Sequence, residues 1–158
     1  MSPRAAWRLE SMGFTQVFDY VPGKADWFAS GLPREGSLTS VPTIGEVARR
    51  DVPTCEPQEK VALAQGRVRA AGWDRCVVVN EERVVLGLLR EKELGADPLG
   101  AVDRVMQPGP TTFRPNVPVR KMAERMRKRD AASVLVTTPD GRLLGVLYRR
   151  DVERMVGA

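Results

Sequence analysis

Histidine is absent from this chain of 158 residues, and only two cysteines are present, Cys55 and Cys76. The missing histidine removes the most common general base, the usual partner of a serine or cysteine nucleophile, and the most common metal ligand. Two cysteines alone provide too few ligands for a zinc site and too few pairs for a disulfide scaffold. We therefore expect no catalytic residues, no metal site and no permanently bound cofactor.

Long apolar stretches are also missing. No run of about 18 apolar residues occurs, so no segment is expected to span a membrane. The N-terminal segment MSPRAAWRLESMGF lacks the apolar core of a signal peptide. With 42% hydrophobic and 28% charged residues, the composition is that of an ordinary globular protein. The expected location is the cytoplasm.

The net charge of +5 is unevenly distributed along the chain. Residues 1–40 sum to zero, residues 41–100 to −1, and residues 101–158 to +6, from 12 basic and 6 acidic side chains. An anionic partner is therefore expected to meet the C-terminal third. A solvated, arginine-rich face would give the same excess, and composition alone does not separate the two interpretations.

The last two thirds of the sequence repeats itself. Shifted by 58 residues, residues 47–94 align with residues 105–152 without a gap, and ten positions are identical, which indicates a duplication. The identical pairs are Val47/Val105, Thr54/Thr112, Pro57/Pro115, Val61/Val119, Arg67/Arg125, Arg69/Arg127, Val78/Val136, Leu86/Leu144, Gly87/Gly145 and Leu89/Leu147.

Both copies predict the same order of elements. An extended segment ending at a proline precedes a helix, and two strands joined by a turn lead into a second, charged helix. The first helix carries a buried stripe of Val61, Ala64 and Val68 in one copy, and of Val119, Met122, Ala123 and Met126 in the other. The predicted strands are 76–79 and 84–89 in the first copy and 134–136 and 143–147 in the second, and the last helix of the second copy has an apolar stripe of Val152, Met155 and Val156.

These elements predict a mixed α/β (α+β) fold. One β-α-β-β-α unit is too small to bury its own sheet, so the two units should pack together through their sheets. We expect an approximate two-fold axis between them, with Val78 and Val136 at equivalent buried positions and a groove between the units that suits a ligand.

The repeat resembles a known family. The order of elements and the phrases VRKMAERMRKRDAASVLVTTPDGRLLGVLYRRDVERM and TIGEVARRDVPTCEP are similar to the CBS domain, here as a tandem pair, the Bateman module. The resemblance covers residues 43–157 and assigns residues 43–100 to the first CBS repeat and residues 101–158 to the second. It implies that adenosine-type ligands bind in the clefts between the repeats and that the module forms a homodimer.

The family signature is a glycine, two apolar residues, threonine or serine, two variable residues and aspartate. The second copy, Gly145–Asp151, keeps the aspartate but has Tyr148 at the hydroxyl position; the first copy, Gly87–Glu93, has Arg90 and Glu93 at these two positions. A carboxylate suits ribose because it accepts strong hydrogen bonds from two adjacent hydroxyl groups. The better site is therefore expected on the second copy, and Asp151→Ala is expected to weaken binding more than the same change at Glu93.

The resemblance implies two sets of ligand-binding residues. The main predicted site comprises Asp151, Tyr148, Arg149, Arg150, Thr111, Thr112, Val134 and Leu135. A second, weaker cleft comprises Arg90, Glu93, Thr54, Cys76 and Val77. Purely structural roles are open for the same residues, since a carboxylate near a helix start, such as Asp151, is favourable whatever the function.

Residues 1–36 belong to neither copy. They resemble the C-terminal end of a rhodanese-like domain, with a predicted helix ending near Met12, a strand over 14–20 and a short helix through Trp27, followed by a linker at 37–42. The matching residues are Leu9, Gly13, Phe14, Val17, Tyr20, Gly23, Lys24, Trp27, Gly31, Leu32 and Pro33. No cysteine precedes Cys55, so no sulfurtransferase activity is expected. The aromatic rings are expected to pack on the repeats or on a second chain, with Phe14 and Trp27 buried.

The sequence thus predicts a regulatory module that binds an adenine nucleotide and signals to a partner protein, without catalysis. Two alternatives are open. One is a nucleic-acid-binding protein that uses the basic residues Arg120, Lys121, Arg125, Arg127, Lys128 and Arg129. It is disfavoured because no aromatic stacking platform accompanies them and acidic residues interrupt them. The other is a purely structural dimerisation module.

Overall fold

The computed structural model describes residues 3–18, 20–33 and 41–157, and most of the predicted linker at 37–42 lies outside these ranges. The helices are α1 (Pro3–Ser11), α2 (Gly23–Ala29), α3 (Ile44–Val47), α4 (Val61–Ala71), α5 (Glu91–Leu94), α6 (Val102–Val105), α7 (Val119–Lys128) and α8 (Arg149–Val156). The strands are β1 (Thr54–Cys55), β2 (Cys76–Val79), β3 (Val85–Leu89), β4 (Gln107–Pro108), β5 (Thr112–Phe113), β6 (Ser133–Thr137) and β7 (Leu143–Tyr148).

The two copies form two sheets of the same design. In each, a short strand runs parallel to the central strand, which pairs antiparallel with the next, so that β1-β2-β3 corresponds to β5-β6-β7. Val78 faces Gly87 and Val136 faces Gly145, with a register shift directly after each valine. Both valines are fully buried. The β-α-β-β-α order and the equivalence of these two positions are confirmed.

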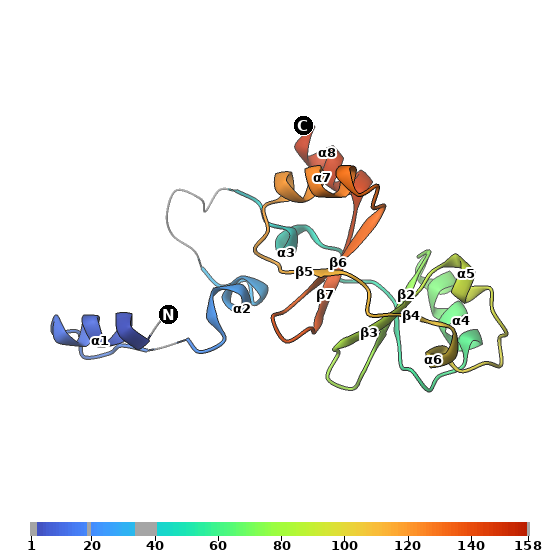
Figure 1. Ribbon diagram of the computed structural model, residues 1–158, viewed down its shortest axis with the longest axis horizontal. Coiled ribbons are helices and arrows are strands. Elements are labelled where there is room, and N and C mark those ends of the chain that lie inside the picture. The colour runs from blue at the N-terminus through green and yellow to red at the C-terminus, as the bar shows by residue number, and fades with distance from the viewer. Residues whose placement is uncertain (1–2, 19, 34–40, 158) are drawn as a thin grey trace.

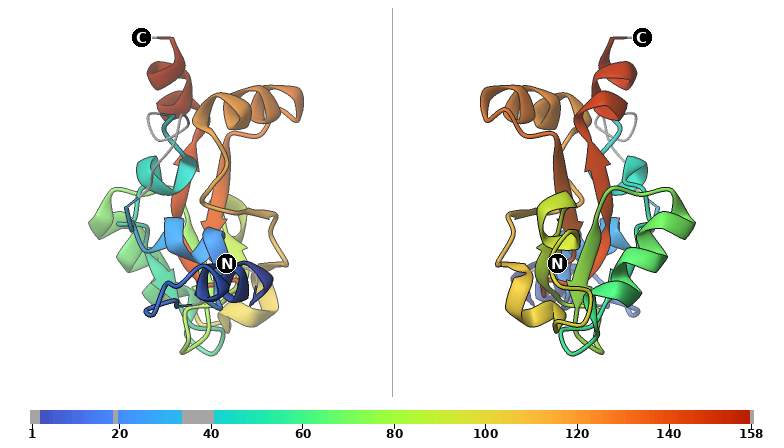
Figure 2. Two further views of the ribbon diagram at one scale, coloured as in Figure 1. Left: turned by 90° about the vertical axis from the view of Figure 1, so that its left-hand side faces the viewer. Right: turned by 90° about the vertical axis from the view of Figure 1, so that its right-hand side faces the viewer.

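The sheets pack against each other around the axis that relates the copies. One hydrophobic core contains Val77 and Leu88 of the first copy together with their counterparts Leu135 and Val146 of the second. An isolated bridge joins Val84 to Arg142, which again are 58 residues apart. Figure 2 shows the strands between α7 and α8 at one end of the molecule and α4 and α6 at the other. The predicted packing through the sheets is therefore present.

Each copy receives the short helix that precedes the other. Ile44 and Ala48, from α3 and its end, belong to the core formed by α7, α8 and the second sheet, whereas Val102 of α6 belongs to the core of the first sheet. The bridge between Arg49 and Val146 matches the pairing of Gln107 with Leu88. The predicted boundaries at residues 43, 100 and 101 follow the duplication in the sequence. In the folded chain, the segment that opens each copy packs on the other copy.

Gly145 allows this crossing chain to approach the sheet. A Cβ atom at this position would lie 2.5 Å from the carbonyl oxygen of Arg49, closer than any side chain permits. Arg49 and Val146 exchange backbone hydrogen bonds of 2.8 and 2.9 Å at the same place. The glycine of the repeated signature is thus explained by a close backbone contact.

The helix predictions hold for both long helices. Val61, Ala64 and Val68 are buried in α4, and Val119, Met122, Ala123 and Met126 in α7. In α8, Val152 is fully buried, but Met155 is half exposed, so its predicted place in the stripe is wrong. Its helix packs mainly on α7 and β7, which cover only part of its surface.

The N-terminal segment differs from its prediction. Helices α1 and α2 lie to one side of the repeats (Figure 1), and residues 14–18 form no strand. Phe14 is 57% exposed, so its predicted burial against the repeats is wrong within this chain. Trp27 is half-buried by local contacts instead: its ring meets that of Tyr20 edge-on at 5.1 Å, and its indole N–H donates to the Pro33 carbonyl at 2.7 Å. Packing of these rings on a second chain stays a prediction.

No helix within the described ranges has both the length and the apolar character needed to cross a membrane.

Candidate functional site

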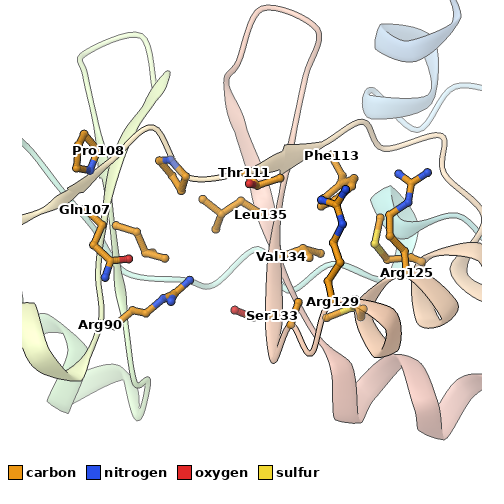
Figure 3. Close-up of a pocket in the computed structure, with 15 residues that line it drawn as sticks. Arg90, Gln107, Pro108, Thr111, Phe113, Arg125, Arg129, Ser133, Val134 and Leu135 are labelled. Atoms are coloured by element: carbon orange, nitrogen blue, oxygen red, sulfur yellow. The ribbon is translucent and has the colours of Figure 1, made fainter.

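A cavity of about 230 Å³ lies between the two copies (Figure 3). One side is formed by the end of β3 and by β4, and the other by the chain entering β5, the first half of β6 and one face of α7. Both copies therefore contribute to one site. Leu88 and Arg90, at the end of β3, line it together with residues of the second sheet.

Apolar and polar groups contribute almost equally to the lining of the cavity. Leu88, Met122, Met126, Val134 and Leu135 line it, and all five are buried. The polar groups among the lining residues include the hydroxyls of Thr111 and Ser133 and the amide of Gln107. Apolar side chains combined with polar groups that can orient a ligand are the usual lining of a small-molecule site.

The charged groups that line the cavity are all positive. Arg90 enters from the end of β3, Arg125 from α7, and Arg129 from the residue that directly follows α7. The spacing of four residues places Arg125 and Arg129 on the same side of the helix. Figure 3 shows Arg90 reaching in from one side and the other two from the opposite side. Arg125 lies over the Phe113 ring, with its Cζ atom 5.5 Å from the ring centroid.

Glu93, although close by, is committed to the fold. Its carboxylate accepts the backbone N–H of Arg90 and the side-chain amide of Gln107, both at 3.0 Å, and the residue is buried. These bonds fix the start of α5 and hold β4 beside β3. The carboxylate therefore stabilises one wall of the cavity, and it is not among the lining residues.

The equivalent position across the axis is filled by side chains of the chain itself. Trp73, Arg75 and Tyr148 stand where the cavity has Ala131, Ser133 and Arg90, and all three are buried. The rings of Trp73 and Tyr148 are 5.7 Å apart, and the Arg75 guanidinium lies 4.6 Å from the Tyr148 ring centroid. The duplication has therefore produced one open site and one filled one.

Hydrogen bonds and charge hold the filled cluster together. The Tyr148 hydroxyl donates to Asp74 at 2.5 Å, and Arg75 donates to both carboxylate oxygens of Asp74 at 2.7 Å. The Arg75 guanidinium, together with the Tyr148 hydroxyl, holds the pKa of Asp74 well below its usual range. Burial and the bond to Asp74 raise the pKa of Tyr148 to about 12. The cluster therefore keeps one charge pattern at neutral pH.

The two cysteines lie together in the core of the first sheet, Cys55 on β1 and Cys76 on β2, and both are buried free thiols. Contact with Cys55, together with burial, raises the pKa of the Cys76 thiol. A buried, protonated thiol is a poor nucleophile.

The structure divides the main predicted set. Thr111, Val134 and Leu135 line the cavity, whereas Tyr148 belongs to the filled cluster. Thr112 is exposed on β5 and is not among the lining residues. The remaining three lie at the start of α8, away from the lining: Arg149 pairs with Asp130 at 2.8 Å, Arg150 lies 5.0 Å from the Tyr148 ring, and Asp151 is partly buried.

The second predicted set is divided in the same way. Arg90 lines the cavity and Glu93 supports it, whereas Thr54, Cys76 and Val77 lie in the first sheet and do not line it. In the structure, Arg90 from the signature of the first copy lies beside strand residues of the second copy, which differs from the predicted grouping. Whether these residues bind a ligand stays a prediction.

Sequence reasoning missed several lining residues. Gln107, Phe113 and Ser133 were not predicted, and Arg125 and Arg129 were expected only as part of a basic surface. The alignment contained one usable signal, because Ala131 and Ser133 are small where the other copy has Trp73 and Arg75. Small residues leave space at a position where large ones fill it.

Comparison with known proteins agrees with this architecture. Residues 102–157 match the family model of the CBS domain. The protein MK0525 of Methanopyrus kandleri is 26% identical over 118 residues, which cover 70% of this chain and 60% of that protein. The chain thus spans less than two thirds of this relative.

Solved structures extend the similarity to both repeats. The CBS domains of a transcriptional regulator from Streptococcus pneumoniae share 25% identity, with a TM-score of 0.65 over 71% of this chain and 97% of that one. The CBS domain pair of protein MJ0100, in complex with 5'-methylthioadenosine and S-adenosyl-L-methionine, shares 17% identity, with a TM-score of 0.63 over 74% of this chain and 97% of that one. The cytosolic domain of the Mg²⁺ channel MgtE in complex with ATP shares 22% identity, with a TM-score of 0.66 over 75% of this chain and 51% of that one. Residues 102–157 thus match the CBS domain, and the two repeats together share the fold of solved CBS domain pairs.

Proposed function

We propose that this chain is a CBS domain pair, a regulatory module that binds an adenine nucleotide or a related adenosyl ligand in the cavity between its repeats. The module would act on a partner protein through that binding, without a reaction of its own. One observation carries the proposal: both repeats build the cavity, with Arg90 from the first and Thr111 and Leu135 from the second.

The binding of a ligand in this position depends on how the two repeats pack. Because its contacts come from both, it binds most tightly to one relative arrangement and shifts the population toward it. A partner that contacts both repeats would detect the change. The exposed rings of Trp7, Phe14 and Phe18 favour a further interface, with a second copy of the chain or with that partner.

The chemistry of the lining matches the proposed ligand class. The apolar surface formed by Leu88, Val134 and Leu135 suits a flat base, and a guanidinium such as that of Arg90 suits phosphate. The structures of MJ0100 with adenosyl ligands and of MgtE with ATP support the same class of ligand.

The likeness of residues 1–36 to a rhodanese-like domain stays a prediction.

The nucleic-acid alternative finds less support in the geometry. Arg125 and Arg129 turn toward the cavity, and Arg127 pairs with Glu153 at 3.3 Å, so the basic residues of α7 do not share one free face. A purely structural dimerisation module is the alternative if no ligand binds.

Thermal melts against AMP, ADP, ATP, NAD, S-adenosylmethionine and cyclic dinucleotides test the proposal. A ligand present at a hundred times its dissociation constant should add about 2.7 kcal/mol to the free energy of unfolding. Ala131→Trp, which copies the residue of the filled position, should abolish that gain. Glu124→Trp, which adds the same ring on the exposed side of α7, is the control. No gain with any ligand, or an equal gain with Ala131→Trp, would refute the site.

A further inference from the structure

The sign of the charges in the cavity restricts the ligand further. Its charged lining residues are Arg90, Arg125 and Arg129, with no aspartate or glutamate among them. The nearest acidic group described above, Glu93, already accepts two hydrogen bonds inside the fold. The cavity therefore carries three positive charges that its own lining does not neutralise.

These three guanidinium groups also have no ion-pair partner in the part of the chain that the structure describes. Other arginines of the same repeat do have one: Arg127 pairs with Glu153, Arg142 with Asp140 at 2.8 Å, and Arg149 with Asp130. Among the described residues of that repeat, Arg104, Arg114, Arg120 and Arg154 also form no ion pair. The three cavity arginines differ from these in lining one site together.

The three groups approach from opposite sides. Arg90 comes from the first repeat, and Arg125 and Arg129 come from α7 and its C-terminal end in the second (Figure 3). Like charges that share a cavity repel one another, and an anion between them removes this repulsion. Each guanidinium can also form paired, charge-assisted hydrogen bonds to phosphate oxygens. One phosphate group carries only about −1.5 to −2 charges at neutral pH, so it does not neutralise three guanidinium groups, whereas a di- or triphosphate carries more negative charge.

We infer that the cavity selects ligands with two or more phosphate groups over adenosine, S-adenosylmethionine and AMP. This inference rests on the proposed function and narrows its ligand class to nucleoside di- and triphosphates. The apolar surface of Leu88, Val134 and Leu135 holds the base, and the arginines hold the phosphates. A polyphosphate contacts both repeats at once, so the arginines also make the ligand sensitive to how the repeats pack.

Calorimetric titration of the full chain with ATP, ADP, AMP, adenosine and inorganic triphosphate tests the inference. ATP and ADP should bind at least about tenfold more tightly than AMP, and adenosine should bind most weakly. Arg129→Gln and Arg90→Gln should each weaken ATP binding by about 10- to 100-fold, because each removes charge-assisted hydrogen bonds. Both variants should leave adenosine binding within about threefold of the parent.

Arg120→Gln is the matched control, since Arg120 is exposed on the same helix and does not line the cavity. Equal affinities for ATP, AMP and adenosine would overturn the charge selection and leave the proposed site intact. Inorganic triphosphate binding as tightly as ATP would instead refute the adenine part of the proposed function and support the phosphate selection. No binding of any of the five would refute both.

Discussion

Arg75 donates a hydrogen bond from Nη1 to the hydroxyl of Ser133, the residue that occupies its own position in the second repeat. The two side chains meet where the axis between the repeats passes. Arg75 is large and extends into the filled cluster with Tyr148, whereas Ser133 is small and faces the open cavity. This one difference between equivalent positions helps to decide which of the two clefts is open.

Asp74 should matter more for stability than an exposed acidic residue. It neutralises Arg75, whose side chain is only 8% exposed, and an unpaired buried charge is costly. Because Asp74 itself is 60% exposed, we expect Asp74→Asn to lower the free energy of unfolding by about 1–2 kcal/mol, less than for a fully buried pair. Urea unfolding measures this. Asp140→Asn, in an exposed pair with Arg142, should cost less than about 1 kcal/mol, and equal losses would contradict the argument.

The Tyr148 hydroxyl should ionise at a higher pH than an ordinary tyrosine. Its pKa is raised to about 12 in the folded protein, above the unfolded value, so its contribution to stability is complete below about pH 10 and is lost as the pH rises through about 12. Absorbance at alkaline pH should show one of the two tyrosines ionising near the upper value. Tyr148→Phe should remove the ionisation at the higher pH. If Tyr20→Phe removes it instead, the assignment is wrong.

Ligand binding should be insensitive to Asp151. The sequence alone favours this residue as the main ribose ligand, but the structure places it on α8, outside the cavity lining. We expect Asp151→Ala to keep the dissociation constant for ATP within about twofold of the parent. Loss of a charge-assisted hydrogen bond at Arg90 should instead raise that constant by about one to two orders of magnitude. Calorimetry on the two variants decides the matter, and a larger loss at Asp151 would restore the grouping expected from the sequence.

Each chain should bind one ligand. Trp73, Arg75 and Tyr148 occupy the second cleft, so calorimetry should give a stoichiometry near one. Trp73→Ala combined with Arg75→Ser copies Ala131 and Ser133 into the first repeat and should raise the stoichiometry toward two. Circular dichroism confirms that the double variant is folded. Two sites in the parent protein would show that the cluster does not block the cleft.

Deletion of residues 1–40 should leave the repeats folded. The cut keeps Pro42, whose carbonyl accepts the backbone N–H of Val119 at the start of α7. It removes exposed apolar side chains, among them Phe14 and Phe18, that make no core with the repeats. We expect an unchanged melting temperature and equal or better solubility. A melting temperature lowered by more than a few degrees would indicate that the segment does pack on the repeats.

Much of the fold could be read from the sequence, because it depends on local pattern. The stripe from Val119 to Met126 defined α7, and runs of β-branched and aliphatic residues defined β2 and β6, since periodicity reports which face of an element is buried. The strand predicted over residues 14–20 failed for the opposite reason: an isolated apolar run forms a strand only when a neighbouring strand pairs with it.

The sequence by itself determined that there are two equivalent units and most of their buried positions, since both follow from a 58-residue offset and from helical and strand periodicity. Only the tertiary structure decided which cleft is open and which residues meet there. Arg90 faces Thr111, Val134 and Leu135 because the sheets pack across an axis that brings the end of one repeat's strand to the other repeat's sheet. No local pattern encodes that meeting, because it depends on contacts between residues far apart in the chain.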